Sequence, residues 1–321
     1  KKNKYFHMKA IVKNIVLIDG ISRAGKLMSG AIISSFKNME SIEFGENFEH
    51  FLPAIKLKKC SNDFAKSYLF NHLNQLIYNK MISRNINFRP SDRTGINNYF
   101  NPKLYKKRLL IKEGDSVIKK ILTTKPTLPF ITHDLMVNYD VFEKLNINVK
   151  MIEIFRNPID LVYSWYKRGL GDRWGKDPRV FTLLVQKNNK PYPWYLYKLP
   201  ENWNKLNVCE KCIYFVTMLT NQSIVKYKKT NNKKKIYVTN YEKIVQNTQQ
   251  EMLNISRFLN TKFSNQTKRI IKKENLPNSS DGKLYLKKKE FIKKKVNKKS
   301  FDELMFLVQK YNKNTYGLTR N

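Results

Sequence analysis

The stretch from Asn14 to Phe36 constrains the fold more than any other part of the chain. It begins with an apolar, β-branched run that ends at Asp19 and Gly20, continues through a short polar loop, and enters a segment whose apolar residues have helical spacing. A strand, a tight loop and a helix in this order direct backbone N–H groups and a helix N-terminus toward one point. The stretch therefore predicts a cradle for a phosphate group.

The loop adds two cations to this cradle, Arg23 and Lys26. Gly20 to Lys26 fits the spacing Gly-x-x-x-x-Gly-Lys, but the next residue is Leu27. A nucleotide triphosphatase has Ser or Thr there, whose hydroxyl holds magnesium. We therefore expect a loop that binds phosphate without a metal ion. The residues expected to line it are Gly20, Ser22, Arg23, Ala24, Gly25, Lys26 and Leu27.

Further strands and helices alternate along the 321 residues, which are enough for one large α/β domain. The ranges expected to form strands are 11–19, 41–45, 128–132, 149–155 and 235–239. The ranges expected to form helices are 26–37, 65–82, 115–122, 158–167 and 206–227, followed by three segments that end with 301–311. This alternation predicts a central parallel sheet flanked by helices, with ligands at the carboxyl ends of the strands. We interpret 84–103 as a surface loop over the site and 169–204 as an aromatic-rich insertion.

A second anion-binding element follows the strand at 149–155. Asn157 is a good helix N-cap and Pro158 suits the first helical position, so Arg156 lies at the mouth of a helix. Ser164 lies about two turns farther on, a span of roughly 10 Å. Arg156 can fold back over that distance to share an anion with Ser164. Either residue alone could be structural, but the phosphate loop upstream favours a joint binding role.

With these two elements, the sequence resembles the PAPS-dependent sulfotransferases. That family pairs a loop for the 5′-phosphosulfate with an Arg-Asn-Pro-x-Asp-x-x-x-Ser segment for the 3′-phosphate, and 156–164 matches the latter. Tyr241-Glu242 resembles the family's Tyr-Glu-Asp/Asn element, whose tyrosine lies near the adenine. The resemblance extends over about 14–260. It implies a P-loop-like fold, PAPS as donor, PAP as product, and a single domain over 1–321.

The resemblance also implies an acceptor base, for which the sequence offers alternatives. Thr132-His133 resembles the family's Lys-Thr-His element without its Lys, and His titrates near neutral pH. Glu43 and Glu46 are competing carboxylates, as another branch of the family uses Glu. At the leaving phosphate, Arg23 stands where the family has Lys or Arg, whereas Lys26 replaces a common Thr. The expected catalytic residues are therefore His133, Arg23 and Lys26.

The acceptor is expected to be a hydroxyl group, and we favour a carbohydrate. Rings that could stack on sugars are concentrated in 169–204, although such rings more often pack in a core. These rings are Trp174, Trp194, Tyr195, Tyr197 and Trp203. Three cations in this region or directly before it, Arg168, Arg173 and Arg179, could meet an acidic sugar.

Two other functions remain open from the residues alone. Gly20, Gly25 and Lys26 would also suit a P-loop kinase for a small molecule. The net charge of +37 would suit a nucleic-acid-binding protein. Lysine accounts for most of this charge, as only 12 of the 62 basic residues are Arg, and runs of lysine are usually solvated surface. We therefore rank the nucleic-acid reading last and expect no nucleic-acid partner.

The cysteine content and the apolar runs of the sequence favour a protein of the cytoplasm. The three cysteines, Cys60, Cys209 and Cys212, are too few for a four-ligand zinc site and indicate no disulfide framework. No apolar run approaches the length that spans a membrane. We expect core or surface thiols, no bound metal and a cytoplasmic location.

Overall fold

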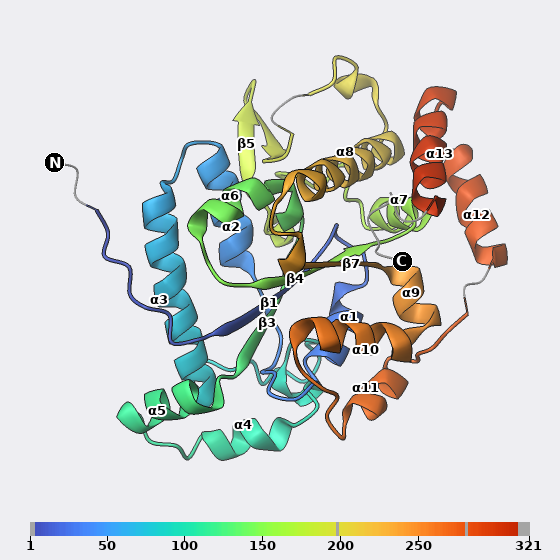
Figure 1. Cartoon of the computed structure of the whole chain (residues 1–321). Coiled ribbons are helices and arrows are strands. Elements are labelled where there is room, and N and C mark those ends of the chain that lie inside the picture. Colours follow the sequence, from blue (N-terminus) through green and yellow to red (C-terminus); the bar gives the residue numbers. More distant parts are fainter. Residues whose placement is uncertain (1–3, 197–198, 280–281, 314–321) are drawn as a thin grey trace.

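The computed structural model describes residues 4–196, 199–279 and 282–313 and is built around a five-stranded sheet (Figure 1). The strands are β1 (Asn14–Asp19), β2 (Glu43–Phe44), β3 (Thr127–Ile131), β4 (Lys150–Phe155) and β7 (Ile236–Asn240). They lie in the order β2-β3-β1-β4-β7, and every neighbouring pair is parallel. The predicted parallel sheet is therefore confirmed, with β1 at its centre.

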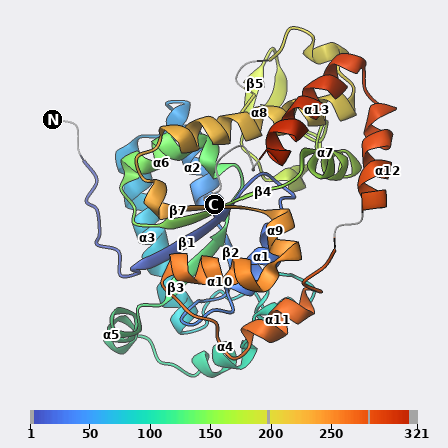
Figure 2. The ribbon, with the colours of Figure 1, turned by 45° about the vertical axis from the view of Figure 1, so that its right-hand side comes forward.

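Helices cover both faces of the sheet, because its central strands are apolar on both sides. In β1, Ile15 and Leu17 belong to one buried cluster, whereas Val16 and Ile18 belong to another. The first face is covered by α2 (Glu46–Lys56), α3 (Asn62–Met81), α5 (Asp115–Thr124), α6 (Tyr139–Leu145), α7 (Pro158–Lys167) and α8 (Val208–Lys229). Two further helices, α12 (Gly282–Lys293) and α13 (Lys298–Asn312), pack on α7 and α8. The second is covered by α1 (Lys26–Ile33), α9 (Tyr241–Gln246), α10 (Thr248–Leu259) and α11 (Thr267–Lys273). Figure 2 shows α10 and α11 on the side of the sheet opposite α8.

The strand expected over 11–19 begins only at Asn14. Two further elements are shorter than expected, and side chains explain both. The helix after the phosphate loop ends at Ile33 because the hydroxyls of Ser34 and Ser35 bond to carbonyls of the preceding turn. The strand expected over 41–45 shrinks to two residues, since the N–H of Ser41 donates to the Tyr105 hydroxyl at 3.0 Å instead of to a strand.

Two regional predictions are wrong. The loop at 84–103 does not lie over the phosphate loop, because it packs at the amino-terminal edge of the sheet. There, the Tyr99 hydroxyl donates to the carbonyl of Met39, next to the start of β3. The chain after β7 forms five helices in its described part, not three, because α9, α10 and α11 are short and separated by turns at Asn247 and Asn260.

The insertion at 169–204 contains a hairpin that the sequence pattern did not predict. β5 (Leu184–Lys187) and β6 (Lys190–Pro193) pair antiparallel around Asn188 and Asn189, which both have positive φ. Adjacent asparagines in this conformation are typical of tight hairpin turns. In the described part of the chain, no helix is long and apolar enough to cross a bilayer.

Candidate active site

The phosphate loop joins the carboxyl end of β1 to α1, and two glycines give it its shape. Gly20 has φ +139°, and a Cβ there would lie 2.4 Å from the Ile154 carbonyl oxygen. Gly25 has φ +98°, and its Cβ would lie 2.5 Å from the Tyr241 ring. Only glycine fits such close approaches at positive φ. No side chain caps α1, so its first N–H groups remain available to an anion.

Arg23 connects this loop to the helix that follows β4. Its Nε donates to Ser164 Oγ on α7 at 2.9 Å. The next residue of α7, Trp165, donates from its indole to the carbonyl of Ser22 at 2.8 Å. Partial burial lowers the pKa of Arg23, and the positive charges of Arg168 and Arg156 lower it further by smaller amounts. The loop and α7 thus form one assembly in which cations are gathered closely enough to repel one another.

Arg156, at the carboxyl end of β4, closes the same assembly. Its Nη1 donates to the carbonyl of Arg23 at 2.8 Å, and its guanidinium lies 4.1 Å from the centre of the Tyr241 ring. Its Nε is buried and has no hydrogen-bond partner among the described residues. A buried charged donor without an acceptor is costly. This geometry suits the binding of an anion between Arg156 and the loop.

Lys26 turns inward instead of toward the solvent. Its side chain is buried, and its Nζ donates to the carbonyls of Gly20 at 2.5 Å and Ile21 at 2.8 Å. Burial lowers the pKa of Lys26, while nearby carboxylates, first Asp19 and then Asp134, raise it. In this conformation the ammonium supports the loop from beneath.

The carboxylates beneath the loop form an acidic cluster, which consists of the buried Asp19 and Glu153 and the half-buried Asp134. Asp19 and Glu153 are register partners on β1 and β4. Asp19 accepts from the Thr132 hydroxyl at 2.9 Å and from the Met136 N–H at 2.8 Å. Burial, and then the charge of Asp19, raises the pKa of Glu153. Burial also raises the pKa of Asp134 to about 8, although Lys26 opposes this shift.

His133 follows β3 and is oriented by a carboxylate that sequence reasoning missed. Glu49 Oε1 accepts the backbone N–H of His133 at 2.8 Å and lies 3.0 Å from its Nδ1. With a carboxylate oxygen as its partner, Nδ1 is the donor in the neutral tautomer that fits this contact, and Nε2 is then the acceptor. The His133 side chain is 34% exposed. It is therefore oriented and accessible.

The two carboxylates considered as alternative bases lie in different surroundings. Glu43 pairs at 2.6 Å with Lys80, whose side chain is fully buried. Glu46 lines the same cavity as His133. Partial burial raises the pKa of Glu46, and the negative charge of Glu49 raises it further. Glu49 lies three residues after Glu46 on α2, on the same face of the helix. That spacing is the sequence signal that could have revealed it.

A cavity of about 400 Å³ opens beside His133 and the phosphate loop. The polar and charged residues that line it are Ser22, Arg23, Glu46, Glu49, His133, Asp134, Arg168, Arg173, Arg179 and Thr182. Arg173 and Arg179 share Asp177, at 2.5 Å and 2.9 Å. Arg168 has no carboxylate partner among the described residues. The lining of the cavity thus combines carboxylates and His133 with three arginines of the insertion region and Arg23.

Comparison with known proteins places this geometry in a family. A family model for the sulfotransferase domain matches residues 15–305. The chain belongs to the sulfotransferase family. A search of curated protein sequences finds no match.

Solved structures similar to this sulfotransferase are distant. The sulfotransferase domain from the curacin biosynthetic pathway is 10% identical with a TM-score of 0.43, over 86% of this chain and 80% of that one. A sulfotransferase from Mycobacterium avium is 12% identical with a TM-score of 0.42, over 84% and 69%. A retinol dehydratase solved with androsterone and PAP is 14% identical with a TM-score of 0.36, over 96% and 82%.

The aromatic residues of the sulfotransferase's insertion divide between core and cavity. Trp194 and Trp203 are buried, and Trp203 packs against Phe215 of α8 with ring centres 5.4 Å apart. Trp174 and Tyr195 line the cavity. Tyr197 lies outside the described residues. Tyr195 is itself only 2% exposed, so the expectation that most of these rings pack in a core holds for Trp194, Tyr195 and Trp203.

The cysteines of the sulfotransferase are free thiols, as expected. Cys209 and Cys212 are buried in α8, where burial raises the pKa of Cys209 to about 11 and that of Cys212 higher still. The part of the chain that the structure describes contains no cluster of His, Cys, Asp and Glu that could hold a metal ion.

Proposed function

We propose that this sulfotransferase moves the sulfuryl group of PAPS to a hydroxyl of a carbohydrate acceptor, with residues 1–321 acting as one domain. The observation that carries the proposal is the assembly of Arg23, Arg156, Ser164 and Tyr241 around the phosphate loop. These residues fit an anionic nucleotide, because no side chain caps the N-terminus of α1 and the buried Nε of Arg156 has no acceptor in the part of the chain that the structure describes.

Each end of the donor has its own group of residues in this proposal. The loop Gly20–Leu27 would hold the 5′-phosphosulfate through backbone N–H groups. Arg156 and Ser164 would hold the 3′-phosphate, and Tyr241 would lie near the adenine, as the family resemblance implies. Bound PAPS would supply the sulfuryl group, and PAP would be the product. No residue in these roles needs a divalent metal.

The reaction is an in-line displacement at sulfur. The acceptor oxygen forms a bond to sulfur while the bond from sulfur to the bridging phosphate oxygen breaks. His133 Nε2 takes the hydroxyl proton, since Glu49 holds its other nitrogen. Arg23 stabilises the negative charge that grows on the bridging oxygen. Lys26 supports the loop from beneath, and it could reach the leaving group only by giving up its two carbonyls.

The cavity beside His133 supports an acidic sugar as acceptor. Arg168 offers a guanidinium with no carboxylate partner in the described part of the chain, and Trp174 offers a ring. Guanidinium groups bind carboxylate and sulfate through paired hydrogen bonds. We therefore place the acceptor's anionic group near Arg168.

A transfer assay tests this function. The protein is incubated with PAPS and matched acidic and neutral glycans, phenols and lipids, and the products are analysed by mass spectrometry. The proposal predicts a sulfated acidic glycan in the presence of EDTA. Phosphorylation of an acceptor from ATP with magnesium, without transfer from PAPS, would favour the kinase alternative instead.

A further inference from the structure

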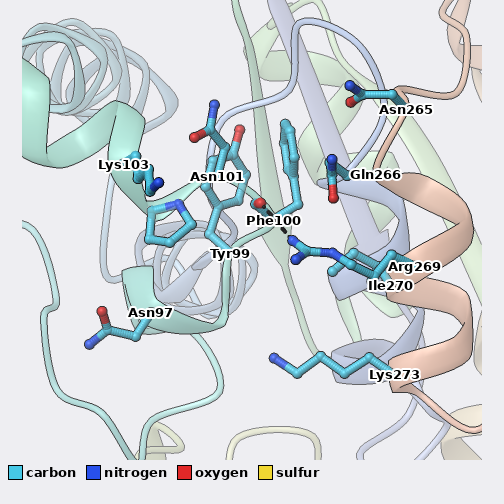
Figure 3. Close-up of a pocket in the computed structure, with 11 residues that line it drawn as sticks. Asn97, Tyr99, Phe100, Asn101, Lys103, Asn265, Gln266, Arg269, Ile270 and Lys273 are labelled. Atoms are coloured by element: carbon cyan, nitrogen blue, oxygen red, sulfur yellow. Dashed lines mark hydrogen bonds between the residues drawn. The ribbon is translucent and has the colours of Figure 1, made fainter.

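A second cavity lies at the opposite edge of the sheet from the phosphate loop. It measures about 800 Å³ and is formed by the segment 97–103 and by α11 (Figure 3). Both walls are tied to the amino ends of the strands. Tyr99 donates to Met39, which bridges to the first residue of β3, and Thr267 of α11 bonds to Ser35 at the end of α1. A strand of five or six residues separates the two edges by roughly 17–20 Å, so the donor nucleotide cannot fill this cavity.

The lining of this cavity is cationic and rich in amides. Its charged side chains are Lys103, Arg269 and Lys273, and its amide side chains are Asn97, Asn101, Asn265 and Gln266. Figure 3 shows Arg269 and Lys273 extending from α11 toward the segment that carries Asn97 and Phe100. Among the residues described, no carboxylate lines the cavity.

No carboxylate of the described residues forms an ion pair with the cations of this lining. Arg269 donates only to the Phe100 carbonyl at 3.2 Å, and Lys273 only to the Asn98 side chain at 3.2 Å. The nearby Glu274 is bound by Arg93 through two hydrogen bonds of 2.6 Å and 2.8 Å. Arg269 and Lys273 are also four residues apart on one helix, where like charges are destabilising. An anion between them would remove that repulsion.

We propose that this cavity is a binding site for an acidic sugar, namely a short saccharide that carries sulfate or carboxylate groups. The three cations would bind its anionic groups. The four amides, which both donate and accept hydrogen bonds, would bind its hydroxyls. The Phe100 ring offers an apolar face to a sugar ring. A volume of about 800 Å³ suits a ligand of this size.

Calorimetry with a highly sulfated disaccharide, its unsulfated parent and inorganic sulfate tests the site. Saturating PAP is present throughout to occupy the donor loop. The double variant Arg269→Gln/Lys273→Gln is compared with Lys119→Gln/Lys120→Gln, which removes the same charge from the exposed surface of α5. Lys103→Gln, at an exposed position, serves as a milder variant should the double variant be unstable.

The proposal predicts that the sulfated disaccharide binds more tightly than its parent or inorganic sulfate. Arg269→Gln/Lys273→Gln should weaken this binding about tenfold or more, Lys103→Gln should weaken it less, and the α5 control should leave it within twofold. PAP affinity should be unchanged in all variants, so this result is independent of the proposed catalytic function. Three results would overturn the proposal. They are a loss of disaccharide affinity in the α5 control equal to that in Arg269→Gln/Lys273→Gln, equal affinity for the sulfated disaccharide and its unsulfated parent, and no binding by the wild type.

Discussion

Arg23 Nε donates a hydrogen bond to Ser164 Oγ at 2.9 Å, joining two segments that are 141 residues apart in the sequence. Arg156 donates to the carbonyl of the same arginine, so three residues of the proposed donor site hold one another in place. A site organised before its ligand arrives loses less entropy on binding. This connection between the loop and α7 is the basis of the predictions below.

Ser164→Ala should weaken PAP binding by about tenfold to a hundredfold, because a hydrogen bond to a charged group is worth about 1.5–3 kcal/mol. Calorimetry measures this effect. The melting temperature should barely change, since Ser164 is only half-buried and its hydroxyl is turned to Arg23. Unchanged PAP affinity in Ser164→Ala would remove this residue from the donor site.

Gly25→Ala should abolish detectable PAP binding. Its Cβ would lie 2.5 Å from the Tyr241 ring, so either the loop or the ring must move. Gly114→Ala is the matched control, because Gly114 also has positive φ, +125°, but nothing lies within 4 Å of its Cβ position. That control should lose about 1–2 kcal/mol of stability through backbone strain and retain PAP affinity. Full PAP binding by Gly25→Ala would contradict the loop geometry described here.

His133→Ala should lower kcat by about 10²-fold to 10⁴-fold, the usual contribution of a general base, while PAP affinity is unchanged. Glu49→Gln should lower kcat less, because it weakens the orientation of His133 without removing Nε2. Single-turnover kinetics with saturating PAPS measures both. If His133→Ala retained activity and Glu46→Gln lost it, the carboxylate that lines the same cavity would be the base.

Glu153→Gln should change how stability depends on pH. Burial raises the pKa of Glu153, so the folded protein holds this proton at pH values where the unfolded chain releases it. The free energy of unfolding therefore falls as pH rises from the unfolded pKa toward the folded one. Gln resembles the protonated carboxyl and does not titrate, so the variant should lose less stability than the wild type as the pH rises above the unfolded pKa of Glu. Urea unfolding at several pH values measures this, and parallel curves for variant and wild type would contradict the assignment.

The sequence predicted the elements whose pattern is local. The apolar runs ending at Asp19 and Phe155 are buried on both faces, and Asn157-Pro158 begins a helix where expected. Helix ends and short strands were harder to predict, because they depend on hydrogen bonds to residues far away in the sequence. The hydroxyl of Tyr105 takes the N–H of Ser41, and no local pattern reveals such a contact.

The candidate site was predictable to a similar extent. The sequence indicated Arg23, Arg156, Ser164 and Tyr241, and the structure brings them together. It did not reveal that Lys26 turns inward or that Glu49 holds His133, since both facts depend on side-chain directions in the folded chain. The buried pairing of Asp19 with Glu153 was equally hidden, because it requires the register of β1 against β4.

Titration of PAP into the wild type and Arg156→Ala in EDTA tests the central claim, that Arg156 and the phosphate loop bind one nucleotide without a metal ion. Lys167→Ala, which removes a charge from the same helix beyond Ser164, is the control. We expect tight binding by the wild type and by the control. The affinity of Arg156→Ala should be about tenfold to a hundredfold lower, because a hydrogen bond to a charged group is worth about 1.5–3 kcal/mol. Binding that requires magnesium, or equal affinity in Arg156→Ala and the wild type, would contradict this claim.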